Sequence, residues 1–397
     1  MHDRSRAAID EFIKGGTPHN KPCTKDFRVL CVIGHGSFAK VLQVQKMDTK
    51  EQYALKVISK EMVIKRGKLD SVQAERSILA QMNHPFIVPL RYAFQSDSKL
   101  YLALEYIPGG ELFFHLKREH RFPIPRVRFY TAEIILAIEY LHASNIVYRD
   151  LKPENVLIRM NGHICLADFG LSKEGVGPQT SINSFCGTPE YLAPEVLLGR
   201  GYDKAIDWWA LGTLAFEMAA GLPPFYNENV KLMYEDILSA KVNFKSSVFR
   251  EQPHLVSFLT GLLEKEASSR LGSSLLDAEE LKSHLFFADI DWNAAAQGKL
   301  QPLFLPSAEG TSGGGGSLSS TPQDSLMLQD LQLGLSAIPN VRVPPVNFDP
   351  VFTGKHVEPS LSPPDADGID PLHVEGFTYT EPSLLLQYKS TMSSEQH

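Results

Sequence analysis

The pattern of apolar residues changes sharply near Gly110, and this change limits how the 397-residue chain can fold. From Phe27 onward, segments rich in Val, Leu and Tyr predict strands: FRVLCVIG, AKVLQVQ, QYALKVI and KLYLALEY. Between them, the segment KRGKLDSVQAERSILAQM has helical spacing. Its apolar residues fall on roughly one face of the predicted helix: Leu69, Val72, Ile78 and Leu79. After Gly110, VRFYTAEIILAIEYLH and KAIDWWALGTLAFEMAAG predict long buried helices. Strands followed by helices indicate an α+β fold rather than alternating βαβ units.

Composition and charge exclude several classes of protein. No run of eighteen apolar residues is present, and 26 residues before Phe27 are too few for a lipid-binding domain, so we expect no direct membrane domain. The net charge of −7 lies mostly after Pro306, and the absence of a basic face argues against nucleic-acid binding. The four cysteines have no C-x-x-C spacing, which argues against disulfides and zinc. We expect a cytoplasmic protein with possible access to the nucleus.

Two segments differ from the rest of the chain in texture. Residues 1–26 have little periodicity and are expected to form an N-terminal extension. The stretch from Ser307 to Ser325 is low in complexity, cannot bury a core and predicts a flexible linker. Order is expected to resume near VNFDPVF, and the apolar FTY at 377–379 interrupts an acidic tail.

A glycine-rich segment, GHGSFAKV at 34–41, lies between two predicted strands. Glycines let the backbone approach phosphates closely, so that successive N–H groups can donate to their oxygens. Alone the motif is weak, because a glycine-rich hairpin is often a plain turn. A dinucleotide-binding fold needs a helix after the loop, whereas AKVLQVQ predicts a strand. The segment therefore argues against a nicotinamide-dependent dehydrogenase.

An interior lysine and a helical glutamate form the next candidate pair. Lys56 stands in the apolar strand YALKV, where an unpaired charge is costly. Glu75, in QAERSIL, is the expected partner, and together they would orient Lys56 toward the α- and β-phosphates of a nucleotide. Taken in isolation, the pair is better explained as a surface salt bridge.

The segments YRDLKPEN and ADFG carry the strongest chemical signal. Asp150 is placed to accept a proton from a hydroxyl nucleophile, and Lys152 to offset charge on a transferring phosphoryl group. Asn155 offers an amide oxygen to Mg²⁺, and Asp168, thirteen residues later, is expected to chelate the same ion. SFCGTPEYLAPE follows, at the place where a substrate platform is needed.

The order of these motifs along the chain resembles the motif set of eukaryotic protein kinases: GHGSFAKV, Lys56, Glu75, YRDLKPEN, DFG and APE. YRDLKPEN with SFCGTPEYLAPE is similar to the AGC group; DFGLSKEG, EYIPGGELFFHL and the tail resemble protein kinase B and the serum- and glucocorticoid-regulated kinases. The resemblance implies a bilobal catalytic domain at 27–287, with a small antiparallel sheet and one helix at 27–105 and a helical lobe at 106–287. Residues 288–397 would form the AGC tail.

The resemblance also implies a Ser/Thr protein kinase that uses ATP and Mg²⁺, bound between the lobes. Leu104 would be the gatekeeper, and Glu105 and Tyr106 would form the hinge toward adenine. The expected catalytic residues are Asp150, Lys152, Lys56 and Glu75. The implied nucleotide site comprises Ile33, Gly34, His35, Gly36, Ser37, Phe38, Val41, Ala54, Lys56, Leu104, Glu105, Tyr106, Glu111 and Phe348.

Substrate preference follows from the same resemblance. Glu111, Glu154 and Glu217 match positions that bind arginines upstream of the acceptor, and Thr188 belongs to the substrate platform. Carboxylates select arginine through bidentate, charge-assisted contacts. The implied target is Arg-x-Arg-x-x-Ser/Thr or similar, although Glu217 is also compatible with an ordinary helix-face charge. The protein is expected to act as a monomer on protein substrates.

Three phosphorylation sites are implied. Ser184 matches the activation-loop site, which an upstream kinase of the phosphoinositide-dependent type would modify; its phosphate would pair with Arg149 and Lys173. Ser362 resembles the turn motif and Thr378 the hydrophobic motif.

Some positions depart from the family pattern or play a structural part. Ala39 replaces a loop glycine, which is tolerable. Ser71 replaces a phosphate-contacting histidine, and Val374 replaces a phenylalanine, which would weaken tail docking by about 1 kcal/mol. Glu195 and Arg270 are expected to form a buried ion pair.

Two other functions remain as alternatives. A kinase-fold scaffold without activity predicts the loss of a phosphate- or magnesium-binding residue, yet Lys56, Asp150, Asn155 and Asp168 are all present. A phosphotransferase for small molecules is disfavoured by CGTPEYLAPE and by Lys152, which favour protein hydroxyls.

Overall fold

The computed structural model describes residues 22–36, 39–176, 182–307, 345–355, 361 and 373–384. The predictions for Ser37, Phe38 and Ser362 lie outside these residues, as do those for most of the 1–26 extension and of the 307–325 linker. Among the described helices, none is long and apolar enough to cross a membrane.

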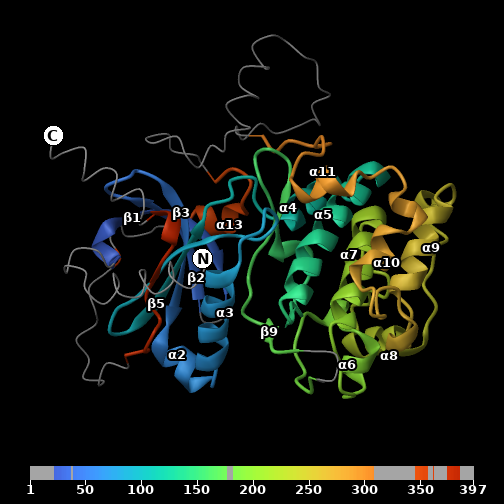
Figure 1. Cartoon of the computed structure of the whole chain (residues 1–397), viewed down its shortest axis with the longest axis horizontal. Coiled ribbons are helices and arrows are strands. Elements are labelled where there is room, and N and C mark those ends of the chain that lie inside the picture. The colour runs from blue at the N-terminus through green and yellow to red at the C-terminus, as the bar shows by residue number, and fades with distance from the viewer. Residues whose placement is uncertain are drawn as a thin grey trace, which may run out of the picture.

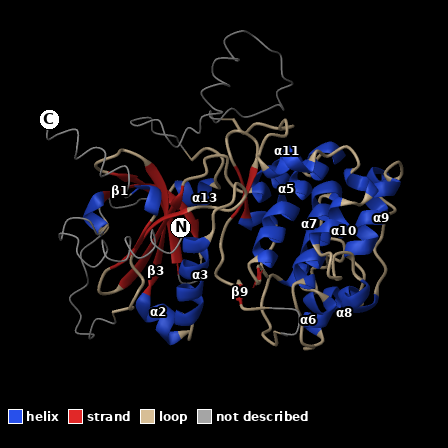
Figure 2. Ribbon diagram, in the orientation of Figure 1, coloured by secondary structure: helices blue, strands red, loops and turns tan. Residues whose placement is uncertain are grey.

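The fold has a sheet lobe and a helical lobe that lie side by side (Figures 1 and 2). The sheet runs in the order β1-β2-β3-β5-β4-β10, and all its neighbouring pairs are antiparallel. Its strands are β1 (Phe27–His35), β2 (Ala39–Lys46), β3 (Gln52–Ser59), β4 (Leu90–Gln95), β5 (Lys99–Glu105) and β10 (Tyr379–Thr380). The predicted α+β architecture is confirmed.

Alternation along the strands places apolar side chains on both faces of the sheet. In β5, Leu100, Leu102 and Leu104 face one core, whereas Tyr101 and Ala103 face another. This is the two-residue period of a strand that is covered on both sides. The first core is completed by helix α3 (Leu69–Gln81), whose predicted apolar stripe is buried or packed against it; the short helix α2 (Lys60–Lys65) precedes α3.

The second lobe is built around two buried helices, α5 (Ile124–Ala143) and α7 (Ala205–Ala220). In α7 every residue from Ala205 to Ala219 is buried, so this helix is surrounded by protein rather than lying on the surface. Around the two lie α4 (Leu112–Glu119), α6 (Pro194–Leu197), α8 (Val230–Ser239), α9 (Pro253–Leu262), α10 (Ala278–Lys282) and α11 (Trp292–Ala296) (Figure 1).

Short strands at the junction connect the lobes. The hairpin of β7 (Val156–Ile158) and β8 (Ile164–Leu166) lies next to the segment that leads into β4. The Leu166 N–H donates to the Phe86 carbonyl, and the Leu166 carbonyl accepts from the Val88 N–H, both at 2.9 Å. A second pair joins β6 (Ile146–Val147) to β9 (Lys173–Glu174). These backbone bonds fix the DFG segment, which follows β8, against both lobes.

The tail contributes two elements to the sheet lobe. Helix α13 (Pro350–Thr353) packs beside β1, and β10 pairs with β4 at the sheet edge. The sequence did not predict that Tyr379 and Thr380 extend the sheet. Pairing covers an edge whose backbone groups would otherwise face solvent.

The predicted ion pair between Glu195 and Arg270 is confirmed. Two Arg270 nitrogens donate to the two Glu195 oxygens at 2.6 and 2.9 Å, and the guanidinium also donates to the Ala205 carbonyl at 3.0 Å. Arg270 is 1% exposed. Arg270 therefore ties the end of the substrate platform, at Glu195, to the start of α7.

Replacing Arg270 with Leu should lower the free energy of unfolding by about 3–5 kcal/mol, because it leaves the Glu195 carboxylate buried without its partner. Chemical denaturation followed by circular dichroism measures the change. Arg250→Leu is the matched control, since Arg250 is exposed and its loss should change stability by less than about 0.5 kcal/mol. Equal effects of the two substitutions would contradict a structural role for the pair.

Candidate active site

A buried lysine links three segments where the lobes meet. Lys56 Nζ lies 2.6 Å from a Glu75 oxygen in α3 and 2.9 Å from an Asp168 oxygen of the DFG segment. Burial lowers the pKa of Lys56, but attraction to Asp168 and Glu75 outweighs it, so the pKa is raised and the ammonium stays charged. The predicted ion pair is thus present, and it is interior rather than a surface salt bridge.

Asp168 has the charge and exposure that a cation ligand needs. The neighbouring Lys56 lowers the pKa of Asp168, so the carboxylate is ionised at neutral pH. Its side chain is about half exposed (51%), and its φ of 56° is in the left-handed region. A non-glycine residue in this region carries strain, and such residues gather at functional sites.

Asp150 is held in a network with the residues predicted to work beside it. Lys152 Nζ lies 3.0 Å from an Asp150 oxygen and 3.0 Å from Thr188 Oγ1, while Thr188 Oγ1 donates to Asp150 at 3.2 Å. The Asn155 amide nitrogen donates to the Asp150 carboxylate at 2.8 Å. This leaves the amide oxygen of Asn155 as its ligand atom, and with Asp168 it gives an oxygen donor set of the kind that Mg²⁺ accepts.

The backbone beneath Asp150 is fixed from α7. Asp207 accepts the N–H groups of Tyr148 and Arg149 at 2.9 and 2.8 Å, and its other partner is His142 at 2.9 Å. Asp207 is fully buried. Burial raises the pKa of Asp150, which suits a group that must accept a proton near neutral pH. Sequence reasoning missed Asp207, because no local motif shows which residue of α7 faces this loop.

Five of the residues predicted to surround adenine form one small cluster with Cys31, which was not predicted. Cys31, Ile33, Tyr106 and Phe348 are buried together, with Val41 and Ala54 packed against them. The rings of Tyr106 and Phe348 are stacked with their centres 5.9 Å apart. The tail phenylalanine therefore lies where the sequence placed it, beside the connection between the lobes.

The glycine segment lies next to Val41, which packs against this cluster. A Cβ at Gly34 would meet the Val41 side chain at 3.4 Å, and the Gly36 N–H donates to the Ala39 carbonyl at 2.8 Å. His35 is exposed. The gatekeeper candidate Leu104 pairs with Ala54 across β3 and β5, so these two predicted lining residues are neighbours in the sheet.

Five carboxylates lie near the substrate platform, and neighbouring members raise one another's pKa values. Burial raises the pKa of Glu111 to about 7, with further contributions from Glu154 and Asp349. Burial also raises the pKa of Glu217 to about 7, with contributions from Glu154 and Glu190. Glu217 accepts a hydrogen bond from the Tyr191 hydroxyl, so it is not a free charge on a helix face. Glu190 and Asp349 were missed, because only the fold brings them to this cluster.

The predicted activation site contacts the catalytic loop directly. Ser184 Oγ lies 2.8 Å from Arg149 Nη1 and 3.1 Å from the Tyr202 hydroxyl, and Arg149 also donates to the Leu171 carbonyl at 2.6 Å. Lys173 is exposed in β9 and makes no ion pair within the described part of the chain. Of the two expected phosphate partners, the structure therefore places only Arg149 against Ser184.

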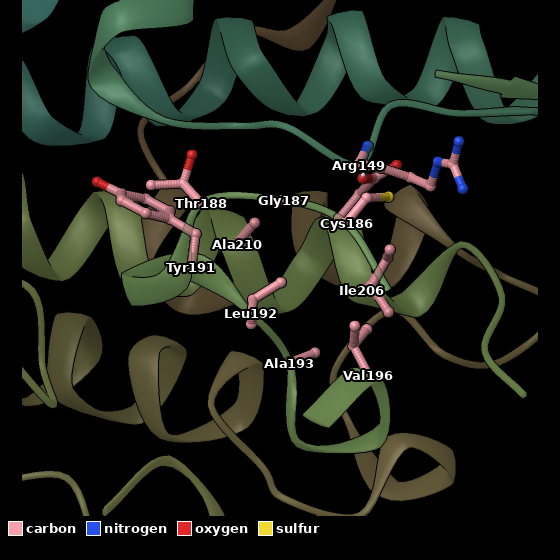
Figure 3. Close-up of a pocket in the computed structure, with 11 residues that line it drawn as sticks. Arg149, Cys186, Gly187, Thr188, Tyr191, Leu192, Ala193, Val196, Ile206 and Ala210 are labelled. Carbon is pink, nitrogen blue, oxygen red and sulfur yellow. Dashed lines mark hydrogen bonds between the residues drawn. The ribbon is translucent and has the colours of Figure 1, made fainter. Parts of the chain in front are cut away.

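Figure 3 shows a small cavity between the platform segment and α7. The residues that line it are Arg149, Cys186, Gly187, Thr188, Tyr191, Leu192, Ala193 and Val196, with Ile206, Asp207 and Ala210 of α7. The cavity measures about 20 Å³, which is room for about one water molecule. Gly187, with φ of 121°, lets the chain bend over it.

The hydrophobic motif lies against the sheet lobe. Val374 is buried and exchanges two hydrogen bonds with the Gln95 side chain, at 2.8 and 3.0 Å. Phe377 is buried, and Arg76 of α3 donates to the carbonyls of Phe377 and Thr378 at 3.1 and 3.0 Å. Thr378 itself is exposed. The tail is therefore docked on α3, next to Glu75, with valine at position 374.

Comparison with known proteins decides the family. Residues 27–287 match the protein kinase domain, which is more than half of the chain. The chain belongs to the protein kinase family. It is 53% identical over 288 residues to the serine/threonine protein kinase ypkA of Aspergillus fumigatus, covering 72% of this chain and 45% of that protein. It is 48% identical over 294 residues to the serine/threonine-protein kinase Sgk2 of Rattus norvegicus, covering 74% and 78%.

A third relative is the serine/threonine-protein kinase gad8 of Schizosaccharomyces pombe, 51% identical over 289 residues, which cover 72% of this chain and half of that protein. These names confirm the predicted resemblance to AGC kinases of the serum- and glucocorticoid-regulated type. The chain spans about half the length of the first curated relatives it matches, with shares of 45% and 50%.

Proposed function

We propose that the protein transfers the γ-phosphoryl group of ATP to serine or threonine in proteins that carry arginines upstream of the acceptor. The observation that carries this proposal is the unbroken set of contacts from Glu75 through Lys56 to Asp168, beside the Asp150 network. An inactive scaffold has no need of a charged, interior lysine aimed at the lobe junction. Membership of the protein kinase family supports the same reaction.

Each residue of the site has a distinct task in this proposal. Lys56, oriented by Glu75, binds the α- and β-phosphates. Asp150 accepts the proton of the attacking hydroxyl, and Lys152 offsets charge on the transferring group. Asn155 and Asp168 would hold Mg²⁺, which when bound neutralises phosphate charge. Thr188, hydrogen-bonded to Asp150 and Lys152, places the substrate platform beside the base.

The arginine preference rests on the carboxylate cluster. Glu154 raises the pKa values of both Glu111 and Glu217, so the three carboxylates concentrate negative charge that a guanidinium would relieve. Phosphorylation of Ser184 by an upstream kinase would place a dianion against Arg149, the residue that precedes the base. Modification of Thr378 would act on a tail segment held by Arg76 of α3.

Asp168→Ala should lower kcat about a thousandfold, because it removes a cation ligand and a partner of Lys56. Radiolabelled ATP and an arginine-rich peptide library measure the transfer. Asp289→Ala is the control, since it removes an exposed carboxylate paired only with Arg128 among the described residues. Equal activity of wild type and Asp168→Ala would overturn the proposed reaction.

Ser184→Ala should lower the activity of protein treated with an activating kinase about tenfold, because no phosphate can then join Arg149 and order the segment. The same peptide assay, before and after treatment, gives the ratio. Ser269→Ala, which removes an exposed serine of the helical lobe, should respond like wild type. Activity unaffected by Ser184→Ala would overturn the regulatory step and leave the reaction standing.

Affinity for arginine-containing peptides should fall as the pH falls. Glu111 and Glu217 have pKa values of about 7, so they are mostly charged at pH 8 and mostly neutral at pH 6. The peptide KM should therefore rise about tenfold between pH 8 and pH 6. A peptide with citrulline in place of arginine keeps the shape without the charge, and its KM should stay nearly constant. The same pH dependence for both peptides would argue against charge recognition.

A further inference from the structure

Four charged side chains of alternating sign join the tail, the sheet lobe and the helical lobe. Glu381 follows β10, Arg91 lies in β4, Glu105 ends β5, and Arg159 follows β7. Arg91 contacts Glu381 through one guanidinium nitrogen and Glu105, at 3.1 Å, through the other. Arg159 contacts the second oxygen of Glu105. Below, these residues are called the charge chain.

Both oxygens of Glu105 are therefore bound, one by each lobe. The side chain of Glu105 is 12% exposed, and those of Arg91 and Arg159 are 27% and 21% exposed, so solvent screens these pairs less than fully exposed ones. Burial lowers the pKa of Arg91, but Glu381 and Glu105 more than offset it, so its pKa is raised. Each charge in the chain has a neighbour of opposite sign.

Within the charge chain, Glu105 is the member that lies beside the proposed nucleotide site. Glu105 directly precedes Tyr106, whose ring stacks on Phe348, and the Glu105 N–H donates to the Pro89 carbonyl at 3.1 Å. Any rotation of the backbone at Glu105 changes the edge that faces adenine in the proposed function. Arg91 and Arg159 limit that rotation, because they hold the carboxylate from opposite sides.

Glu381, at the tail end of the charge chain, makes two contacts with Arg91. The Glu381 N–H donates to the Arg91 carbonyl at 2.9 Å, in addition to the contact between the side chains. Arg91 is thus fixed by a residue 290 positions later, and only while the tail is docked. Without Glu381, Arg91 keeps one carboxylate partner and gains freedom to turn toward solvent.

We propose that Arg91 and Arg159 are positioning residues that hold the hinge through Glu105, and that Glu381 couples docking of the tail to affinity for nucleotide. This inference rests on the proposed function, since it names how the same ATP site is regulated. Coupling between two binding events is reciprocal, so nucleotide also strengthens docking of the segment around Glu381.

The test compares Glu381→Ala with Glu375→Ala in the full chain. Both remove one carboxylate from the same docked segment, but Glu375 is exposed and has no ion pair among the described residues. Glu381→Ala should raise the KM for ATP and the Kd of a fluorescent ADP about threefold, and should change kcat by less than about twofold. Glu375→Ala should change neither constant.

Two further variants test whether the effect of Glu381 on the ATP KM passes through the charge chain. In an Arg91→Met background, Glu381→Ala should cause no additional rise in the ATP KM, because its effect passes through Arg91. Arg159→Met should raise the ATP KM about threefold while the tail stays docked, as judged by hydrogen exchange of residues 377–381. If these residues had only a structural role, their substitution would lower kcat and stability, and would not raise the ATP KM selectively.

The outcomes separate this inference from the function on which it rests. Wild-type protein that neither binds ADP nor transfers phosphate overturns the proposed function. Wild-type protein that does both, with Glu381→Ala equal to Glu375→Ala in ATP KM, overturns the inference alone. Full additivity of Arg91→Met and Glu381→Ala also overturns it, because the two residues would then act independently.

Discussion

The ion pair between Lys56 and Glu75 is the interaction on which the site depends. Moving two charges out of water costs several kcal/mol for each ion, and only close pairing recovers that cost. The pair therefore persists only while α3 packs on the sheet and Asp168 approaches from the other lobe. A displacement of α3 would also displace Glu75 and so alter the position of Lys56. The docked tail is held by Arg76 of the same helix, and it is therefore linked to the site.

The helical lobe fixes the conformation of the irregular loop that contains Arg149. Arg149 has a φ of 69°, a conformation that is unfavourable for a residue with a side chain. The buried carboxylate of Asp207 binds two successive N–H groups of this loop and supplies the order that the backbone itself does not favour. Because α7 is enclosed by protein on all sides, it is a rigid place from which to do this.

The sequence was sufficient to identify the site residues that stand in short local motifs, because such motifs can be recognised without the fold. Lys56, Asp150, Asn155 and Asp168 each stand in such a segment, and the structure brings them together. What sequence could not supply is long-range placement: nothing near Arg159 indicates that it meets Glu105, 54 positions away. Edge pairing of β10 was missed for the same reason, since two residues are too short a strand to show a period.

The tail shows how a weak local signal can have a strong effect in the fold. A strand of two residues buries little surface, but it extends an existing sheet, so its backbone bonds form against a partner that is already ordered. Valine at position 374 fits this arrangement, because the Gln95 side chain bonds its backbone and does not depend on a larger side chain. Docking is therefore shared among backbone bonds, the burial of Phe377 and the pairing of Glu381 with Arg91.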